Sequence, residues 1–150
     1  MSTPERPMLE VLLVDDNEDD ILLARRAFDR SRLRLVHCAR SGPEALAYLR
    51  GEGEFRRMPC PALVILDLNM PGLTGLEVLE ALKTDETLRA IPVLVFTASN
   101  RPEDVEAAYS AGAATFLRKP ISLEQFRVTV RELEQYWTAV ADVPLNLGRP

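Results

Sequence analysis

The sequence predicts a five-stranded, doubly wound α/β domain in which helices cover both faces of a parallel sheet. Two observations lead to this prediction. Three short segments are apolar at every position, which is typical of strands buried on both faces. Strand-like segments also alternate along the chain with amphipathic stretches that begin with helix-capping residues. This alternation indicates parallel strands joined by right-handed helical crossovers.

The predicted strands are short, and three of them lack any polar position. A half-exposed strand would instead alternate apolar with polar residues. The expected strands, in chain order, contain Val11–Val14, Leu33–Cys38, Ala62–Leu66, Val93–Phe96 and Thr115–Leu117.

Most of the predicted helices begin with a recognisable capping residue. Ser41, Thr74 and Ser122 each precede a Glu or Gln by three residues, which is the spacing of a capping box. Asn100 is expected to cap a fourth helix, which has a proline in its first turn. The first helix is expected to begin near Glu18. A stripe of apolar residues at helical spacing marks the last helix: Leu123, Phe126, Val130, Leu133 and Trp137.

Length and composition limit the classes of protein. A chain of 150 residues suits one domain, and a formal net charge of −5 argues against a nucleic-acid-binding surface, which needs a basic face. No apolar run is long enough to span a membrane, the N-terminus lacks the apolar core of a signal peptide, and two cysteines make no disulfide framework. We therefore expect a cytoplasmic domain over residues 9–141, between a flexible N-terminus, 1–8, and a C-terminal extension, 142–150.

Charged or hydroxyl-bearing side chains lie where four of the predicted strands end: Asp15, Asp16, Asp67, Thr97 and Lys119. Ligands of open α/β sheets bind outside the carboxyl ends of the strands. Three converging carboxylates repel one another unless a cation lies among them, and oxygen-only ligands suit Mg²⁺. A lysine and a hydroxyl beside them can hold a phosphoryl group, and an aspartate can be the nucleophile that accepts it. These residues predict metal-assisted phosphoryl transfer to one of the aspartates.

Four motifs carry this chemistry: Val14-Asp15-Asp16-Asn17, Leu66-Asp67-Leu68-Asn69-Met70-Pro71-Gly72, Thr97-Ala98 and Lys119-Pro120. Together they closely resemble the response-regulator receiver domain of two-component signalling, from about Leu9 to about Tyr136. The resemblance implies a flavodoxin-like sheet of strand order 2-1-3-4-5 with five helices. It also implies a protein that takes a phosphoryl group from a sensor histidine kinase and catalyses only its own phosphorylation and dephosphorylation.

Carried over residue by residue, the resemblance implies a phosphoacceptor and a metal site. Asp67 is the expected phosphoacceptor. Asp16 and Asp67 are expected to bind Mg²⁺ directly, Asp15 mainly through water, and Asn69 through its backbone carbonyl. The alternative for Asp15 and Asp16 is that they only cap the first helix.

The same resemblance implies how the phosphoryl group is held and sensed. Thr97 and Lys119 are expected to bind phosphoryl oxygens, and the small Ala98 to leave room for access. Phe116 takes the aromatic switch position, although it could simply be a core residue. Pro120 matches a cis-peptide site that would aim Lys119 at the crevice.

A narrower resemblance concerns the partner. It rests on the insertion Gly51–Pro61, the stretch at 82–85, Leu88–Pro92, Tyr109, and the ending Tyr136-Trp137 with Val143-Pro144-Leu145. These segments resemble the single-domain regulators paired with bacterial phytochromes, which implies a bacteriophytochrome as the kinase. That group often has Thr-Ser after the fourth strand, where this chain has Thr97-Ala98-Ser99.

Other functions fit the sequence less well. A haloacid-dehalogenase type of phosphohydrolase needs Asp-x-Asp after the first strand, where this chain has Asn17 as the third residue. A flavin carrier would be repelled by Asp15 and Asp16, and a receiver that no longer takes phosphate would not need the complete set of site residues. No DNA-binding output is expected, so the signal should pass through protein contacts. His37, Cys38 and Cys60 are expected to be structural.

The last helix predicts a homodimer. Its apolar stripe continues beyond the length needed to cover the sheet, and the surplus residues are Tyr136, Trp137, Val140 and Val143. A self-complementary twofold contact is the commonest use of such a surface. The alternative is that the tail folds back over its own domain.

Overall fold

The computed structural model of the chain describes residues 6–98 and 101–144. The expected cap Asn100 lies outside the described residues. So do positions 1–5 of the predicted N-terminal segment and 145–150 of the predicted C-terminal extension.

Five strands form one parallel sheet, as the sequence predicts. They are β1 (Leu9–Val14), β2 (Leu33–Ala39), β3 (Leu63–Leu66), β4 (Val93–Thr97) and β5 (Thr115–Arg118). Their order in the sheet is β2-β1-β3-β4-β5. This order confirms the predicted 2-1-3-4-5 topology, in which β1 and β3 lie side by side at the centre.

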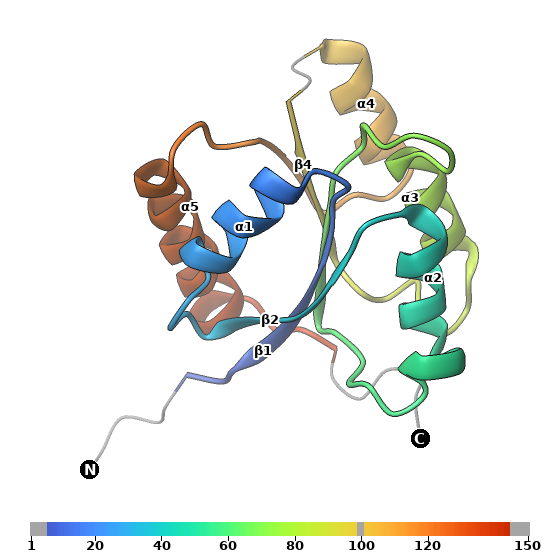
Figure 1. Cartoon of the computed structure of the whole chain (residues 1–150), viewed down its shortest axis with the longest axis horizontal. Helices are drawn as coiled ribbons and strands as arrows, with labels where there is room; N and C mark the ends of the chain where they lie inside the picture. The colour runs from blue at the N-terminus through green and yellow to red at the C-terminus, as the bar shows by residue number, and fades with distance from the viewer. Residues whose placement is uncertain (1–5, 99–100, 145–150) are drawn as a thin grey trace.

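Helices cover both faces of the sheet (Figure 1). The helices are α1 (Glu18–Ala27), α2 (Gly42–Arg50), α3 (Gly75–Thr84), α4 (Pro102–Ser110) and α5 (Leu123–Gln135), with a 3-10 turn at Gly53–Phe55 and a π-helical turn at Tyr136–Val140. α1 and α5 lie against one face, and α2, α3 and α4 against the other. The arrangement is the doubly wound one expected from the alternation of elements.

Side-chain caps start four of the five helices. Ser41, Thr74 and Ser122 accept hydrogen bonds from the backbone N–H three residues on, and at Thr74 the return bond from Glu77 completes a capping box. Asn17 caps α1, so the alternative in which Asp15 and Asp16 do no more than cap that helix is wrong. Each cap satisfies a backbone donor that the helix leaves unpaired.

The sheet is buried on both sides. One group of apolar side chains fills the space under α1 and α5, including Ile21, Phe28 and Phe126, and another lies under α2, α3 and α4, including Leu49 and Leu79. Because apolar side chains and helices pack on both faces, the polar residues that follow the strands lie at the edge of the sheet and not on its faces.

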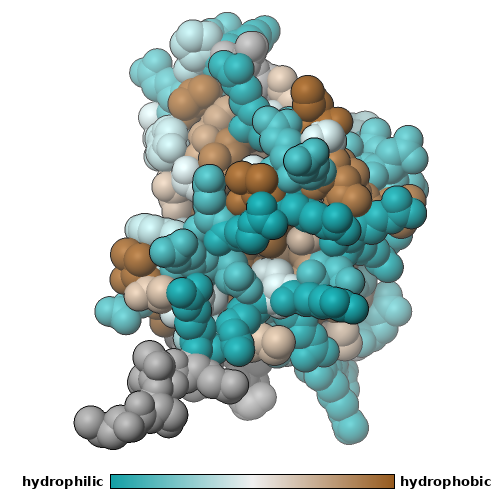
Figure 2. All heavy atoms as spheres, turned by 90° about the vertical axis from the view of Figure 1, so that its left-hand side faces the viewer, coloured by the Kyte–Doolittle hydropathy of each residue, from teal (hydrophilic) through white to brown (hydrophobic). Residues whose placement is uncertain are grey.

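The surface over α1 and α5 is mostly hydrophilic, with hydrophobic side chains in separate patches (Figure 2). Leu22 of α1 and Val128 of α5 are among the large apolar residues left exposed. Within the described residues, no helix combines the length and the hydrophobicity needed to cross a membrane.

Candidate functional site

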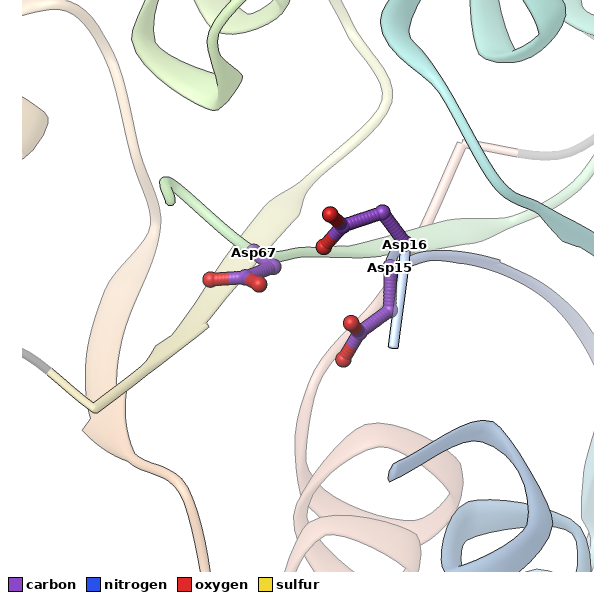
Figure 3. A group of neighbouring side chains, drawn as sticks. All are labelled: Asp15, Asp16 and Asp67. Carbon is purple, nitrogen blue, oxygen red and sulfur yellow. The ribbon is translucent and has the colours of Figure 1, made fainter. Parts of the chain in front are cut away.

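Three carboxylates converge at the carboxyl ends of β1 and β3. Asp15 and Asp67 directly follow these neighbouring strands and are buried, whereas Asp16 is exposed. The three side chains lie close together where the two strands end (Figure 3), and each offers an oxygen within 4.8 Å of the others. The structure therefore brings together the three aspartates that the sequence singles out.

Two similar turns hold the buried carboxylates in place. The backbone N–H of Asn17 donates to Oδ1 of Asp15 at 3.0 Å, and that of Asn69 donates to Oδ1 of Asp67 at 3.0 Å. Burial raises the pKa of Asp15, and the Asn17 N–H and the Lys119 ammonium offset part of that rise. The second oxygen of each carboxylate, Oδ2, faces the Lys119 ammonium.

Gly75 allows α3 to start directly behind Asp67. A Cβ at this position would lie 2.1 Å from the backbone oxygen of Asp67 and 2.5 Å from Cα of Leu68. Both contacts are with backbone, which cannot swing aside as a long side chain can. The absence of a side chain at Gly75 therefore sets the position of the loop that carries Asp67.

Lys119 reaches into the site from the end of β5. Its Nζ lies 2.9 Å from Oδ2 of Asp15, 3.0 Å from Oδ2 of Asp67 and 2.7 Å from Oδ2 of Asp20. Burial alone would lower the pKa of Lys119, but hydrogen bonds to Asp20 and Asp15 and the charge of Asp67 outweigh it, and the pKa lies above its usual value. The ammonium is thus a fixed positive charge in the site.

Asp20 is the site residue that sequence reasoning missed. It lies in the first turn of α1, and its backbone N–H donates to the capping Asn17 side chain at 3.0 Å. Side chains in a helix lean toward its N-terminus, so a residue in the first turn can reach past the cap. The predicted start of the helix near Glu18 is the sequence signal that could have located it.

Thr97 and Phe116 lie on the β4–β5 side of the site. The buried Thr97 accepts a hydrogen bond at Oγ1 from the side-chain amide of Asn69 at 2.8 Å, and its backbone oxygen accepts from the Lys119 N–H at 3.0 Å. Phe116 is half-buried, and its N–H donates to the Tyr109 hydroxyl at 3.2 Å. Thr97 is therefore linked both to the Asp67 loop and to β5.

The expected cis bond before Pro120 is wrong. No peptide bond among the described residues is cis, and the bond between Lys119 and Pro120 is trans. With this trans bond, Lys119 already reaches its carboxylate partners.

His37 and the cysteines lie away from these carboxylates. Nε2 of His37 is 2.7 Å from a Glu44 carboxylate oxygen, and its ring stacks on Tyr48 with centroids 4.9 Å apart. Cys38 and Cys60 form no disulfide with each other, and burial raises the pKa of Cys38. These contacts fit the structural roles expected from the sequence.

The fold packs two of the four residues expected to form a dimer surface against the core and leaves the other two exposed. Trp137 and Val143 pack against the core under α1 and α5, whereas Tyr136 and Val140 are exposed. The π-helical turn closes with a 2.8 Å hydrogen bond from the Ala141 N–H to the Tyr136 oxygen, after which the chain leaves the helix. Part of the surplus apolar surface is thus buried within the same chain.

Comparisons with known proteins agree with this geometry. The family model for the response regulator receiver domain matches residues 11–131. The probable methanogenesis regulatory protein FilR2 of Methanothrix harundinacea is 43% identical over 129 residues, which cover 85% of this chain and 82% of that protein. The response regulator Rcp1 of Synechocystis is 33% identical over 145 residues, or 96% of this chain and 99% of Rcp1.

Two solved structures are similar in sequence and in fold. The phosphorylated cyanobacterial phytochrome response regulator RcpA has a TM-score of 0.83 and 37% identity, covering 91% of this chain and 98% of RcpA. The Mn²⁺-bound form of Rcp1 has a TM-score of 0.80 and 33% identity, covering 91% of this chain and 99% of Rcp1.

Proposed function

This chain belongs to the response regulator receiver domain family, and we propose that it is a signalling protein that accepts a phosphoryl group on Asp67. One observation carries the proposal: the buried Asp67 carboxylate touches the Lys119 ammonium while lying within metal-binding reach of two further carboxylates. A carboxylate oxygen of Asp67 would form the new O–P bond as the P–N bond of a kinase phosphohistidine breaks, and the imidazole would leave.

We propose that Mg²⁺ is bound by Asp15, Asp16 and Asp67, with the backbone carbonyl of Asn69 as a further ligand. The donor set fits this ion, because it consists of oxygens alone and the three carboxylates can approach a common centre. A divalent cation there would neutralise the carboxylates and the developing charge on the phosphoryl oxygens. The Mn²⁺-bound form of the similar Rcp1 supports a divalent site in this chain.

Thr97 and Phe116 are proposed to report phosphorylation. The Thr97 hydroxyl, which now accepts from Asn69, would turn to donate to a phosphoryl oxygen, and Lys119 would bind another. Because β4 pairs with β5, a shift of Thr97 can reach Phe116 and, through its N–H, Tyr109 on α4. The surface over α4 and β5 would change as a result.

The partner proposed for this chain is a sensor histidine kinase of the bacteriophytochrome type, acting in the cytoplasm. The similarity of this chain to the cyanobacterial phytochrome response regulator RcpA supports this choice. On this proposal the chain turns over no external metabolite, and its output passes through contacts with a downstream protein.

A homodimer through the last helix and tail remains part of the proposal. Tyr136 and Val140 are the residues of the predicted surface that are free to contact a second copy, while Trp137 and Val143 would support them from beneath. Sedimentation of the full chain and of a truncation after Gln135 tests this. Monomers in both cases at tens of micromolar, with and without phosphate, would contradict it.

Phosphorylation itself is tested with a small phosphodonor such as acetyl phosphate and Mg²⁺. Intact mass spectrometry should show one added phosphate, which base removes and acid does not. The phosphate should be absent from Asp67→Asn and present in Asp19→Asn, a control in the exposed first turn of α1. Equal labelling of Asp67→Asn, or label on His37, would overturn the proposal.

A further inference from the structure

Asp20 makes the shortest ion pair in the candidate site. Its Oδ2 lies 2.7 Å from Nζ of Lys119, compared with 2.9 Å for Asp15 and 3.0 Å for Asp67. It comes from α1, whereas Asp15 and Asp67 follow central strands. Asp20 therefore holds Lys119 from the helix side of the crevice.

The position of Asp20 is set by the helix cap. Asn17 accepts the backbone N–H of Asp20 at 3.0 Å and anchors the first turn of α1 at the end of β1. The side chain of Asp20 is then free to pair with Lys119, and an amide in its place would leave the cap unchanged.

Three carboxylates lie within ion-pair distance of the Lys119 ammonium, which has three N–H donors. A phosphoryl oxygen that approaches the ammonium competes with these carboxylates for its N–H donors. The side chains of Asp15 and Asp67 are each 5% exposed, whereas that of Asp20 is 37% exposed. A buried carboxylate that loses its cation is costly, but a partly exposed one can be rehydrated. Of the two partners that stay ionised once Asp67 carries the phosphoryl group, Asp15 and Asp20, Asp20 is thus the one released at the lower cost.

Starting from the proposed role of Asp67, we propose that Asp20 is a positioning residue that competes with the phosphoryl group for the Lys119 ammonium. Asp20 keeps Lys119 engaged in the unphosphorylated protein and thereby weakens the binding of the phosphoryl group. Removing its charge should free one ammonium donor and reduce the repulsion of the incoming anion.

Beryllofluoride, an analogue of the phosphoryl group, tests this in the presence of Mg²⁺. Titrations of the full chain followed by ¹⁹F NMR should show Asp20→Asn binding the analogue about two- to fivefold more tightly than the unmodified protein, since a partly exposed ion pair is worth up to a factor of about five. Asp20→Glu retains the charge and should return the affinity toward that of the unmodified protein. Asp19→Asn removes an exposed charge from the same helix turn and should change the affinity less than about twofold.

A second readout follows Lys119 directly. In ¹H–¹⁵N spectra of the unphosphorylated protein, Asp20→Asn should shift the Lys119 ammonium signal, and Asp19→Asn should not. Equal effects of the two variants on affinity and spectrum, or weaker binding by Asp20→Asn, would overturn the proposal for Asp20 while leaving Asp67 as the acceptor. Failure of the unmodified protein to bind beryllofluoride would instead overturn the proposed function and, with it, the competition.

Discussion

Replacing Lys119 with Met should destabilise the metal-free protein strongly at neutral pH. Methionine keeps much of the length of the side chain but removes the ammonium that pairs with Asp15, Asp67 and Asp20. Removing one partner of a buried ion pair costs about 3–5 kcal/mol. Because Asp20 is partly exposed, we expect a loss near the lower limit, about 3 kcal/mol in the free energy of unfolding. For a domain of this size, that corresponds to a fall of roughly 6–12 °C in Tm.

The loss should depend on pH with a defined sign. Burial already raises the pKa of Asp15, and without Lys119 the pKa should rise further, because the lysine normally lowers it. A carboxyl whose pKa is higher in the folded than in the unfolded state destabilises the fold when it is ionised. Protonation removes that penalty, so the deficit of Lys119→Met should shrink as the pH falls from 7 toward 5. Mg²⁺ should reduce the deficit at pH 7 for the same electrostatic reason.

Urea denaturation with and without Mg²⁺, at several pH values, measures these effects. Lys83→Met is the matched control, since the Lys83 ammonium donates to the backbone oxygens of Arg89 and Ile91 and pairs with no carboxylate among the residues that the structure describes. Its deficit should be the same with and without Mg²⁺ and between pH 5 and 7. The electrostatic reasoning would be refuted if Lys119→Met behaved like this control.

Three further changes have defined outcomes. Asp16→Ala should weaken Mg²⁺ binding at least tenfold in a calorimetric titration, since an exposed carboxylate ligand is lost without a change in packing; unchanged affinity would remove Asp16 from the metal site. Gly75→Ala should cost about 3 kcal/mol in thermal unfolding and lower the rate of phosphorylation, because its Cβ would displace the backbone of Asp67; a stable, fully reactive variant would show that the loop can move. Thr74→Ala should cost about 1 kcal/mol through the loss of the α3 cap, with phosphorylation retained.

Local sequence pattern is sufficient to predict the sheet and most of the site. Runs such as Val11–Val14 and Leu63–Leu66 are apolar throughout because they are covered on both faces, and the structure buries them as expected. Parallel strands end at one edge, so Asp15, Asp67 and Lys119 must meet there once the strand order is known. These features depend on the pattern of apolar residues and on the shared direction of the strands, and both can be read from the sequence.

Some features depend on how the covering helices pack. Trp137 and Val143 continue an apolar pattern that suits a partner surface, yet both pack on the core of the same chain because the π-helical turn redirects the tail. The pattern identifies residues that need burial, but only the packed structure decides what buries them.

The charged site likewise contains residues that the sequence predicts and one that only the packed structure reveals. The sequence by itself determines that Asp15, Asp16, Asp67 and Lys119 share one edge of the sheet. Only the tertiary structure adds Asp20, which is 99 residues from Lys119 along the chain and pairs with it at 2.7 Å. That contact depends on the angle at which α1 lies on the sheet beside α5. Local propensity does not encode this angle, because it results from the packing of many side chains far apart in the sequence.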